Sequence, residues 1–138
     1  MIFQAEPAAD EKSVAELSLP SHVPYLIIGA GTAAMAAYRA IRTKNVNAKV
    51  LLVGDEEFKP YMRPPLSKDM WFTEDKELVD QLKFKTWSGR DRSLFFENDQ
   101  YYCSPSELDA SDKGGVAVAT GNRVRIYSSC VHVFKRSV

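Results

Sequence analysis

The 138-residue chain has little cysteine, little histidine and no net charge, and each of these properties argues against a class of function. Its two cysteines, Cys103 and Cys130, lie far apart without metal-type spacing, so we expect two free thiols. His22 and His132 are isolated as well, and the sequence therefore predicts no metal site. Eighteen basic residues balance eighteen acidic ones, which gives no overall attraction to nucleic acid or to an anionic membrane.

Long apolar runs are missing too: no stretch approaches the roughly 20 consecutive apolar residues of a membrane-spanning helix. The first 19 residues lack the apolar run of a signal peptide. They also lack the arginine-rich, acid-poor composition of a mitochondrial presequence, since their acidic side chains face Lys12 alone. We expect residues 1–21 to form a disordered, mostly polar leader. The length and the 45% hydrophobic content suit one domain with a core of its own.

The clearest pattern in the chain lies between residues 23 and 53. Residues 25–28 form a short apolar run, as expected of a strand buried on both faces of a parallel sheet. Residues 32–44 predict a helix with cations in its last turn, and residues 49–53 predict a second buried strand. Together these segments predict a right-handed βαβ unit. The apolar face of the helix is expected to consist of Ala34, Ala37, Tyr38 and Ile41.

Beyond residue 53 the weaker patterns predict only short elements. We expect a short helix at residues 66–71, a helical turn capped by Ser104, and strands at residues 82–84, 93–96, 101–103 and 116–118. Residues 124–127 are expected to pair beside the last of these strands, and residues 128–138 to be a divergent tail. The predicted fold class is α/β: a partial Rossmann-like domain at residues 22–127, with a parallel βαβ unit plus short antiparallel strands.

The turn between the first strand and the first helix fits a nucleotide-binding pattern. Residues 29–34, Gly-Ala-Gly-Thr-Ala-Ala, match G-x-G-x-x-G/A. Gly29 permits a tight turn, Gly31 leaves room for a pyrophosphate, and Ala34 lets the helix pack closely on the strands. The N–H groups of the first helical turn would then face the phosphates. A plain strand-to-helix corner is the alternative, but the buried strand before the turn and the amphipathic helix after it favour dinucleotide binding.

Charged residues follow the second strand. Asp55 or Glu56 stands about 20–25 residues beyond the glycines, where a carboxylate can accept hydrogen bonds from both hydroxyls of a ribose. Arg63 and Lys68 lie in a proline-stiffened loop that would carry two cations back over the pyrophosphate, which suits a long ligand such as FAD. Two surface cations are the alternative.

Several stretches of the chain resemble the apoptosis-inducing-factor family. Residues 24–34, Pro-Tyr-Leu-Ile-Ile-Gly-Ala-Gly-Thr-Ala-Ala, are similar to its first strand and turn, and residues 61–72, Tyr-Met-Arg-Pro-Pro-Leu-Ser-Lys-Asp-Met-Trp-Phe, to its most diagnostic segment. The resemblance continues in residues 82–93 and 114–118, and covers about residues 21–124. The family comprises mitochondrial FAD-dependent NADH oxidoreductases of the glutathione-reductase-like fold, linked to respiratory-chain assembly and to caspase-independent cell death.

The resemblance implies roles for individual residues. Residues 29–33, which are Gly29, Ala30, Gly31, Thr32 and Ala33, correspond to the pyrophosphate turn, and Asp55 and Glu56 to an acidic pair at the adenosine ribose. Arg63 resembles the arginine on the FAD phosphates, and Val124 a residue whose backbone meets the adenine. Lys68 resembles the lysine near the isoalloxazine ring and is the candidate catalytic residue, because a cation near the flavin N5–C4 edge stabilises negative charge on the reduced ring.

The departures from the family pattern limit the expected activity. The second half of the FAD domain, with the glutamate that pairs with the lysine, the NADH domain and the C-terminal domain have no counterpart in these residues. Residues 119–121, Ala-Thr-Gly, are interpreted as a coincidental likeness to a later flavoprotein motif, and the resemblance is expected to end after Val124. The sequence therefore predicts the FAD-binding portion of an NAD(P)H oxidoreductase, truncated and inactive alone; whether the chain is itself an enzyme stays open. A non-catalytic interaction fragment and an unstable product are the alternatives.

Partners and compartment are implied by the resemblance alone. Full-length members use NADH with FAD, dimerise, bind an intermembrane-space import protein, and bind DNA through surface cations. A basic cluster near Trp87 is the corresponding DNA-binding candidate here, but the net charge of zero favours a solvated face; its members are Lys83, Lys85, Arg90 and Arg92. The resemblance predicts the mitochondrial intermembrane space.

Overall fold

The computed structural model describes residues 19–20, 22–126 and 131–135 as one sheet with helices on both faces, a second small unit and a hairpin. The helices are α1 (Thr32–Lys44), α2 (Asp69–Phe72), α3 (Lys76–Asp80) and α4 (Pro105–Ala110), with 3₁₀ turns η1 (Pro64–Ser67) and η2 (Asp99–Tyr101). The strands are β1 (Tyr25–Ile28), β2 (Lys49–Val53), β3 (Lys83–Lys85), β4 (Asp91–Ser93), β5 (Gly115–Ala119), β6 (Asn122–Ile126) and β7 (Val131–Lys135). The α/β fold class is confirmed.

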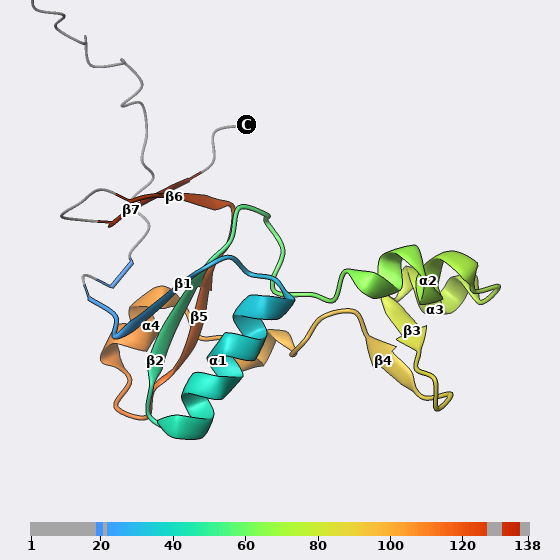
Figure 1. Ribbon diagram of the computed structural model, residues 1–138, viewed down its shortest axis with the longest axis horizontal. Helices are drawn as coiled ribbons and strands as arrows, with labels where there is room; N and C mark the ends of the chain where they lie inside the picture. Colours follow the sequence, from blue (N-terminus) through green and yellow to red (C-terminus); the bar gives the residue numbers. More distant parts are fainter. Residues whose placement is uncertain (1–18, 21, 127–130, 136–138) are drawn as a thin grey trace, which may run out of the picture.

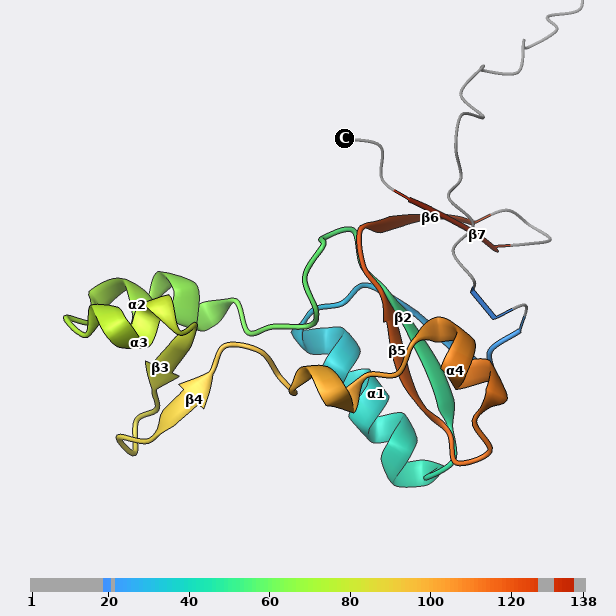
Figure 2. The same cartoon turned by 180° about the vertical axis from the view of Figure 1, so that it is seen from behind.

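The main sheet is parallel and has the strand order β1-β2-β5. Helix α1 covers one face and α4 the other, as the two opposite views show (Figures 1 and 2). On the α1 side Val50 and Leu52 pack with Val116, whereas Leu51 and Val53 pack toward Leu108 of α4. Side chains alternate between the faces of a strand, so both faces of β2 are buried.

The two predicted strands differ in burial. The prediction of a buried strand is confirmed for β2, where Val50 and Leu52 are fully buried. For β1 the same prediction is wrong, because Ile28 remains 53% exposed and Tyr25 37% exposed. Within the described residues β1 pairs with β2 alone and forms an edge of the sheet. An apolar run therefore marks the strand but does not reveal how many neighbours it has.

Helix α1 begins and ends at the residues predicted from the sequence. Its buried residues are Ala34, Met35 and Tyr38, and Ile41 packs against the same core. Ala37, which we expected on this face, is exposed. The helix is rotated so that the longer Met35 side chain, rather than Ala37, meets the sheet, which buries more apolar area there.

Helix α4 confirms the predicted cap. Ser104 Oγ accepts a hydrogen bond from the Glu107 N–H (3.2 Å), and the Ser104 N–H donates to Glu107 Oε2 (2.8 Å). This reciprocal arrangement satisfies two donors that a helix start otherwise leaves open. These bonds from Ser104 also lower the pKa of the Glu107 carboxyl, since they favour its charged form. The cap orients the helix so that Leu108 is fully buried against the sheet.

The second unit contains α2, α3 and the antiparallel pair β3–β4, and extends to one side of the main sheet (Figure 1). Its core is Met70, Phe84 and Leu94. The helix predicted at residues 66–71 is divided between η1 and α2. The strand predicted at 82–84 corresponds to β3, and the one predicted at 93–96 lies earlier, at β4.

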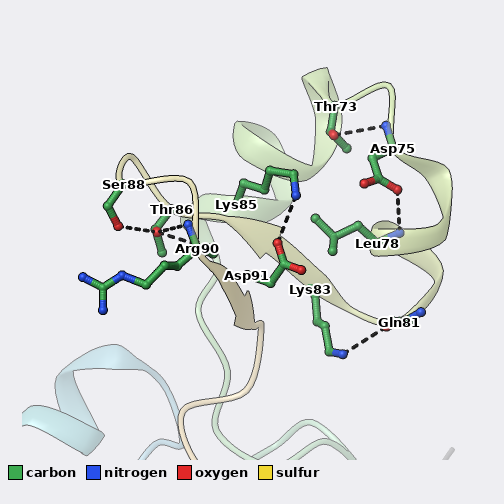
Figure 3. A network of polar contacts seen from close by, with 10 residues as sticks. All are labelled: Thr73, Asp75, Leu78, Gln81, Lys83, Lys85, Thr86, Ser88, Arg90 and Asp91. Carbon is green, nitrogen blue, oxygen red and sulfur yellow. Dashed lines mark hydrogen bonds and ion pairs between the residues drawn. The ribbon is translucent and has the colours of Figure 1, made fainter.

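Helix α3 was not predicted, although a local signal for it exists. Asp75 Oδ1 accepts from the Leu78 N–H (3.1 Å), and Thr73 Oγ1 accepts from the Asp75 N–H (3.2 Å), so the helix start is capped by side chains (Figure 3). An aspartate three residues before the capped N–H is a common helix signature. With five residues, α3 is too short to show an apolar period.

Two further expectations after residue 100 are wrong. Residues 101–103 do not form a strand: Tyr101 ends η2, and Cys103 makes one isolated bridge to Ala117. Strand β6 pairs with β7 and not with β5. Gly121, at φ +65°, turns the chain between β5 and β6, a conformation that glycine adopts without strain. The expected leader lies outside the described residues except for residues 19–20, and β7 lies within the expected tail.

Candidate functional site

A cavity of about 360 Å³ opens where the turn before α1 meets the loop after β2. Both segments follow the carboxyl ends of parallel strands, the edge at which open α/β sheets bind ligands. The residues that line the cavity are Gly29, Ala30, Gly31, Gly54, Asp55, Glu56, Phe58, Tyr61 and Arg63.

The glycine turn joins the end of β1 to the uncapped start of α1. Gly29 has φ +116° and its N–H donates to the Val53 carbonyl (2.7 Å), which joins the ends of β1 and β2. Gly31 stands at the N-cap of α1, and neither a side-chain cap nor an acidic residue is present in the first turn of this helix. The opening N–H groups of a 13-residue helix are thus without a capping side chain, an arrangement suited to an anion.

The space around Gly31 indicates whether a dinucleotide would fit the cavity. Its φ of −97° is open to any residue, and a Cβ placed on it would meet no protein atom within 4 Å. Neither backbone strain nor packing within the described residues calls for a glycine here. A pyrophosphate passing close to the backbone would account for the missing side chain. The residues present therefore fit a dinucleotide.

Gly54 belongs to the site and was missed in the sequence. A Cβ on Gly54 would lie 2.8 Å from Ala30 Cβ, so the loop after β2 approaches the glycine turn more closely than any other residue would allow. The Gly54 N–H donates to the Ala119 carbonyl (3.0 Å). The available signal was a glycine directly after a buried strand, which marks a close backbone approach.

Glu56, Tyr61 and Arg63 form one polar network in the wall of the cavity. The Tyr61 hydroxyl donates to Glu56 Oε2 (2.6 Å), and the Arg63 guanidinium donates to Glu56 Oε1. The guanidinium carbon also lies 5.7 Å from the centroid of the Tyr61 ring, within the range of a cation–π contact. The hydrogen bond to Glu56, with burial as a second cause, raises the pKa of the Tyr61 phenol.

Residues 119–121 support the acidic loop. The Gly121 N–H donates to the Glu56 carbonyl and the Asn122 N–H to the Gly54 carbonyl, both at 2.8 Å. The Ala-Thr-Gly segment therefore has a structural role beside the candidate site, whatever the origin of its likeness to a later motif.

The other predicted site residues lie outside the lining of this cavity. Thr32 and Ala33 are exposed in the first turn of α1. Lys68 is exposed at the junction of η1 and α2, where its carbonyl accepts from the N–H groups of Trp71 and Phe72. Val124 is half-buried in β6 and packs against the core that contains Leu51 and Leu108. The structure thus gathers residues 29–31, Asp55, Glu56 and Arg63 around one cavity.

A second, apolar cavity of about 210 Å³ shares Phe58 and Tyr61 with the first. Its remaining lining residues are Leu66, Leu82, Leu94 and Phe95. Phe58 and Tyr61 therefore separate a polar cavity beside the glycine turn from an apolar one beside the second unit.

Other chemistry is limited in the described part of the chain. No group of His, Cys, Asp and Glu residues suited to a metal is found there, and no helix there is long and apolar enough to cross a membrane. Cys103 is a free thiol whose pKa is raised by burial, and Cys130 lies outside the described residues. In the basic cluster Lys85 pairs with Asp91 (3.1 Å) and Lys83 donates to Gln81 (3.0 Å), as Figure 3 shows.

Comparison with protein families gives one extended match. The model of the pyridine nucleotide-disulphide oxidoreductases matches residues 23–137. The match includes the βαβ unit and the glycine turn, and it runs past Val124, where we expected the resemblance to end.

Curated relatives cover similar parts of the chain. A mitochondrial apoptosis-inducing factor 1 of Drosophila melanogaster is 51% identical over 109 residues, 78% of this chain and 15% of that protein. A mitochondrial apoptosis-inducing factor 1 of Dictyostelium discoideum is 42% identical over 78 residues, 56% of this chain and 15% of that protein. The ferredoxin–NAD(+) reductase component of a Burkholderia cepacia anthranilate 1,2-dioxygenase system is 35% identical over 112 residues, 75% of this chain and 28% of that protein.

Proposed function

The chain belongs to the pyridine nucleotide-disulphide oxidoreductase family, and we propose that its cavity holds the adenosine-diphosphate half of FAD. The segment is of the apoptosis-inducing-factor type. The observation that carries the proposal is the open space beside Gly31 at the uncapped start of α1. A helix N-terminus and a bare backbone together suit a pyrophosphate.

Several residues in and around the cavity have a proposed part in that binding. The amides of residues 31–33 meet the pyrophosphate, and Asp55 accepts from the ribose hydroxyls at the end of β2. Arg63 lines the same cavity and meets a phosphate oxygen through its guanidinium. Val124 lies near the adenine and Lys68 near the isoalloxazine ring, roles that rest on the family resemblance. FAD, when bound, supplies the hydride-accepting chemistry.

The wider function is proposed from the relatives. The chain would be part of an FAD-dependent NAD(P)H oxidoreductase of mitochondria, with the redox and cell-death roles that the resemblance implies, and residues 22–127 would be its FAD-binding portion. Intermembrane-space location, dimerisation and import-protein binding belong to the same proposal. DNA binding by the basic cluster is disfavoured, because two of its cations already have polar partners.

A second candidate function, a non-catalytic interaction fragment, is favoured by one observation. Strand β1 presents an edge with exposed Ile28 and Tyr25, and such edges pair readily with other chains. Concentration-dependent association without binding of FAD or ADP would support this candidate over the first.

Gly31→Val tests the cofactor assignment. A Cβ at this position meets no protein atom and the backbone is extended, so the variant should fold as the wild type does. It should weaken binding of ADP and FAD by about tenfold or more, because a branched side chain would stand in the phosphate path. Calorimetric titration measures both ligands, and Ala40→Val, on an exposed position of α1, is the matched control. Unchanged affinity in Gly31→Val would refute the assignment.

A further inference from the structure

We propose that Glu56 is a positioning residue, whose carboxylate holds Arg63 and Tyr61 in the wall of the cavity so that Arg63 meets the phosphates of a bound dinucleotide. This inference rests on the proposed function and refines it. It assigns Glu56 to the support of a phosphate-binding arginine, and leaves the ribose to Asp55. The sequence alone had left Asp55 and Glu56 equivalent.

Glu56 uses both of its carboxylate oxygens within the network. Oε2 of Glu56 accepts from the Tyr61 hydroxyl at 2.6 Å, and Oε1 accepts from the Arg63 guanidinium. Hydrogen bonds between a carboxylate and a charged or phenolic donor are among the stronger ones in proteins. A ribose that took Glu56 as its acceptor would compete with two side chains that themselves line the cavity.

The backbone of Glu56 is anchored as well. Its carbonyl accepts from the Gly121 N–H at 2.8 Å, and two residues earlier the Gly54 N–H donates to the Ala119 carbonyl at 3.0 Å. The backbone of this loop is thus tied to the turn after β5. A residue with a fixed backbone and both carboxylate oxygens engaged is suited to hold the side chains of Arg63 and Tyr61 in place.

Arg63 is a side chain that needs such a support. Its side chain is 65% exposed, and a long exposed arginine loses much rotamer freedom when it is immobilised. The contact with Glu56 and the face of the Tyr61 ring hold the guanidinium before any ligand arrives. Preorganisation of this kind raises affinity because the side chain has already lost its conformational entropy before the ligand binds.

The test compares ligands that contain phosphate with one that does not. In Glu56→Gln the affinity for ADP and FAD should fall by about tenfold, the effect of weakening one charge-assisted contact, while the affinity for adenosine stays within about twofold. Arg63→Met should give a similar loss, and the double variant should lose little more, since both changes remove the same contact. Equal losses for adenosine and ADP, or fully additive losses, would overturn the inference.

A matched control is available in the chain. Glu97 pairs with Arg39 at 2.8 Å, and neither residue lines the cavity. Glu97→Gln therefore removes the charge of a partly buried, arginine-paired carboxylate at a distance from the site, and should leave the affinity for all three ligands unchanged.

A readout without any ligand separates this inference from the proposed function. If Glu56 holds Tyr61, the Tyr61 phenol should titrate at lower pH in Glu56→Gln than in the wild type, which NMR of ring-labelled tyrosine can follow. An unchanged Tyr61 titration would overturn the network. Wild-type protein that binds neither ADP nor FAD would instead refute the proposed function, while the Tyr61 titration still decides whether Glu56 holds its neighbours.

Discussion

At the scale of single residues, the sequence predicted the site where the chemistry is local. Gly29 and Gly31 belong to one short motif, Asp55 follows the next strand, and the structure brings all three to one cavity. Phe58 and Tyr61 were missed because their parts arise from contacts that no spacing rule encodes, whereas Gly54 was missed although its place directly after a buried strand is a signal. Gly54 lies close to Ala30, and the Tyr61 hydroxyl donates to Glu56. Both contacts depend on how the loop after β2 folds back.

Not every glycine of this chain belongs to the candidate site, and Gly114 allows a prediction about stability. A Cβ there would lie 2.6 Å from the Ala48 carbonyl oxygen and closer still to the Asn47 carbonyl, and its φ is +67°. Gly114→Ala should therefore lower the free energy of unfolding by about 1–3 kcal/mol, through strain and steric overlap. Urea unfolding followed by circular dichroism measures the change. A loss below about 0.5 kcal/mol, the usual size of a neutral surface substitution, would contradict the packing described.

At the scale of elements, local sequence signals predicted which helices and strands form better than they predicted which strands pair. The βαβ segments and the cap of α4 were predicted because buried runs, a 3.6-residue period and a capping serine are written in adjacent residues. The edge position of β1 and the pairing of β6 with β7 were not, since the neighbour of a strand is set by the whole sheet. Residues 101–103 looked like a strand, but their aromatic side chains serve another contact.

That contact joins α1 to the segment around η2. The hydroxyls of Tyr38 and Tyr101 lie 2.9 Å apart and their rings meet edge to face, as do those of Tyr101 and Tyr102. Burial, with the nearby charge of Glu97, raises the pKa of Tyr102 to about 12, and burial raises that of Tyr38 as well.

The stability contributed by Tyr102 should therefore decrease at alkaline pH. The folded state holds the phenol proton more tightly than the unfolded chain, whose tyrosine pKa is 10.0, so this contribution is complete below pH 10 and is lost as the pH rises toward about 12. Unfolding free energies measured at a series of pH values should decline over this range, and less steeply in Tyr102→Phe. An identical decline in the variant would show that Tyr102 is not shielded as described.

At the scale of the whole molecule, the chain spans 15% of the length of each apoptosis-inducing-factor relative that it matches. The described residues form one glycine-turn cavity at the edge of a three-stranded sheet. Hydride transfer requires a nicotinamide held against the flavin ring, and the candidate residue for the ring, Lys68, lies outside the lining of this cavity. We therefore propose that the described residues form one part of a flavin site.

Activity of the 138-residue polypeptide should reflect this. Even with FAD supplied, purified protein should oxidise NADH at a rate close to that of free FAD alone, because the described residues include no second site proposed to hold the nicotinamide. Steady-state absorbance measurements against a protein-free control make the comparison. Robust turnover above that control would show that these residues build a complete site.

The central claim is that the cavity beside the glycine turn binds the diphosphate of an adenine dinucleotide. Amide NMR spectra of the nitrogen-labelled chain, recorded during titration with ADP, test it most directly because each backbone N–H reports its own surroundings. We expect saturable shifts that centre on the amides of residues 29–33 and of Asp55, and that need about tenfold more ADP or higher in Gly31→Val. Shifts confined to other surfaces, or none at millimolar ADP, would contradict it.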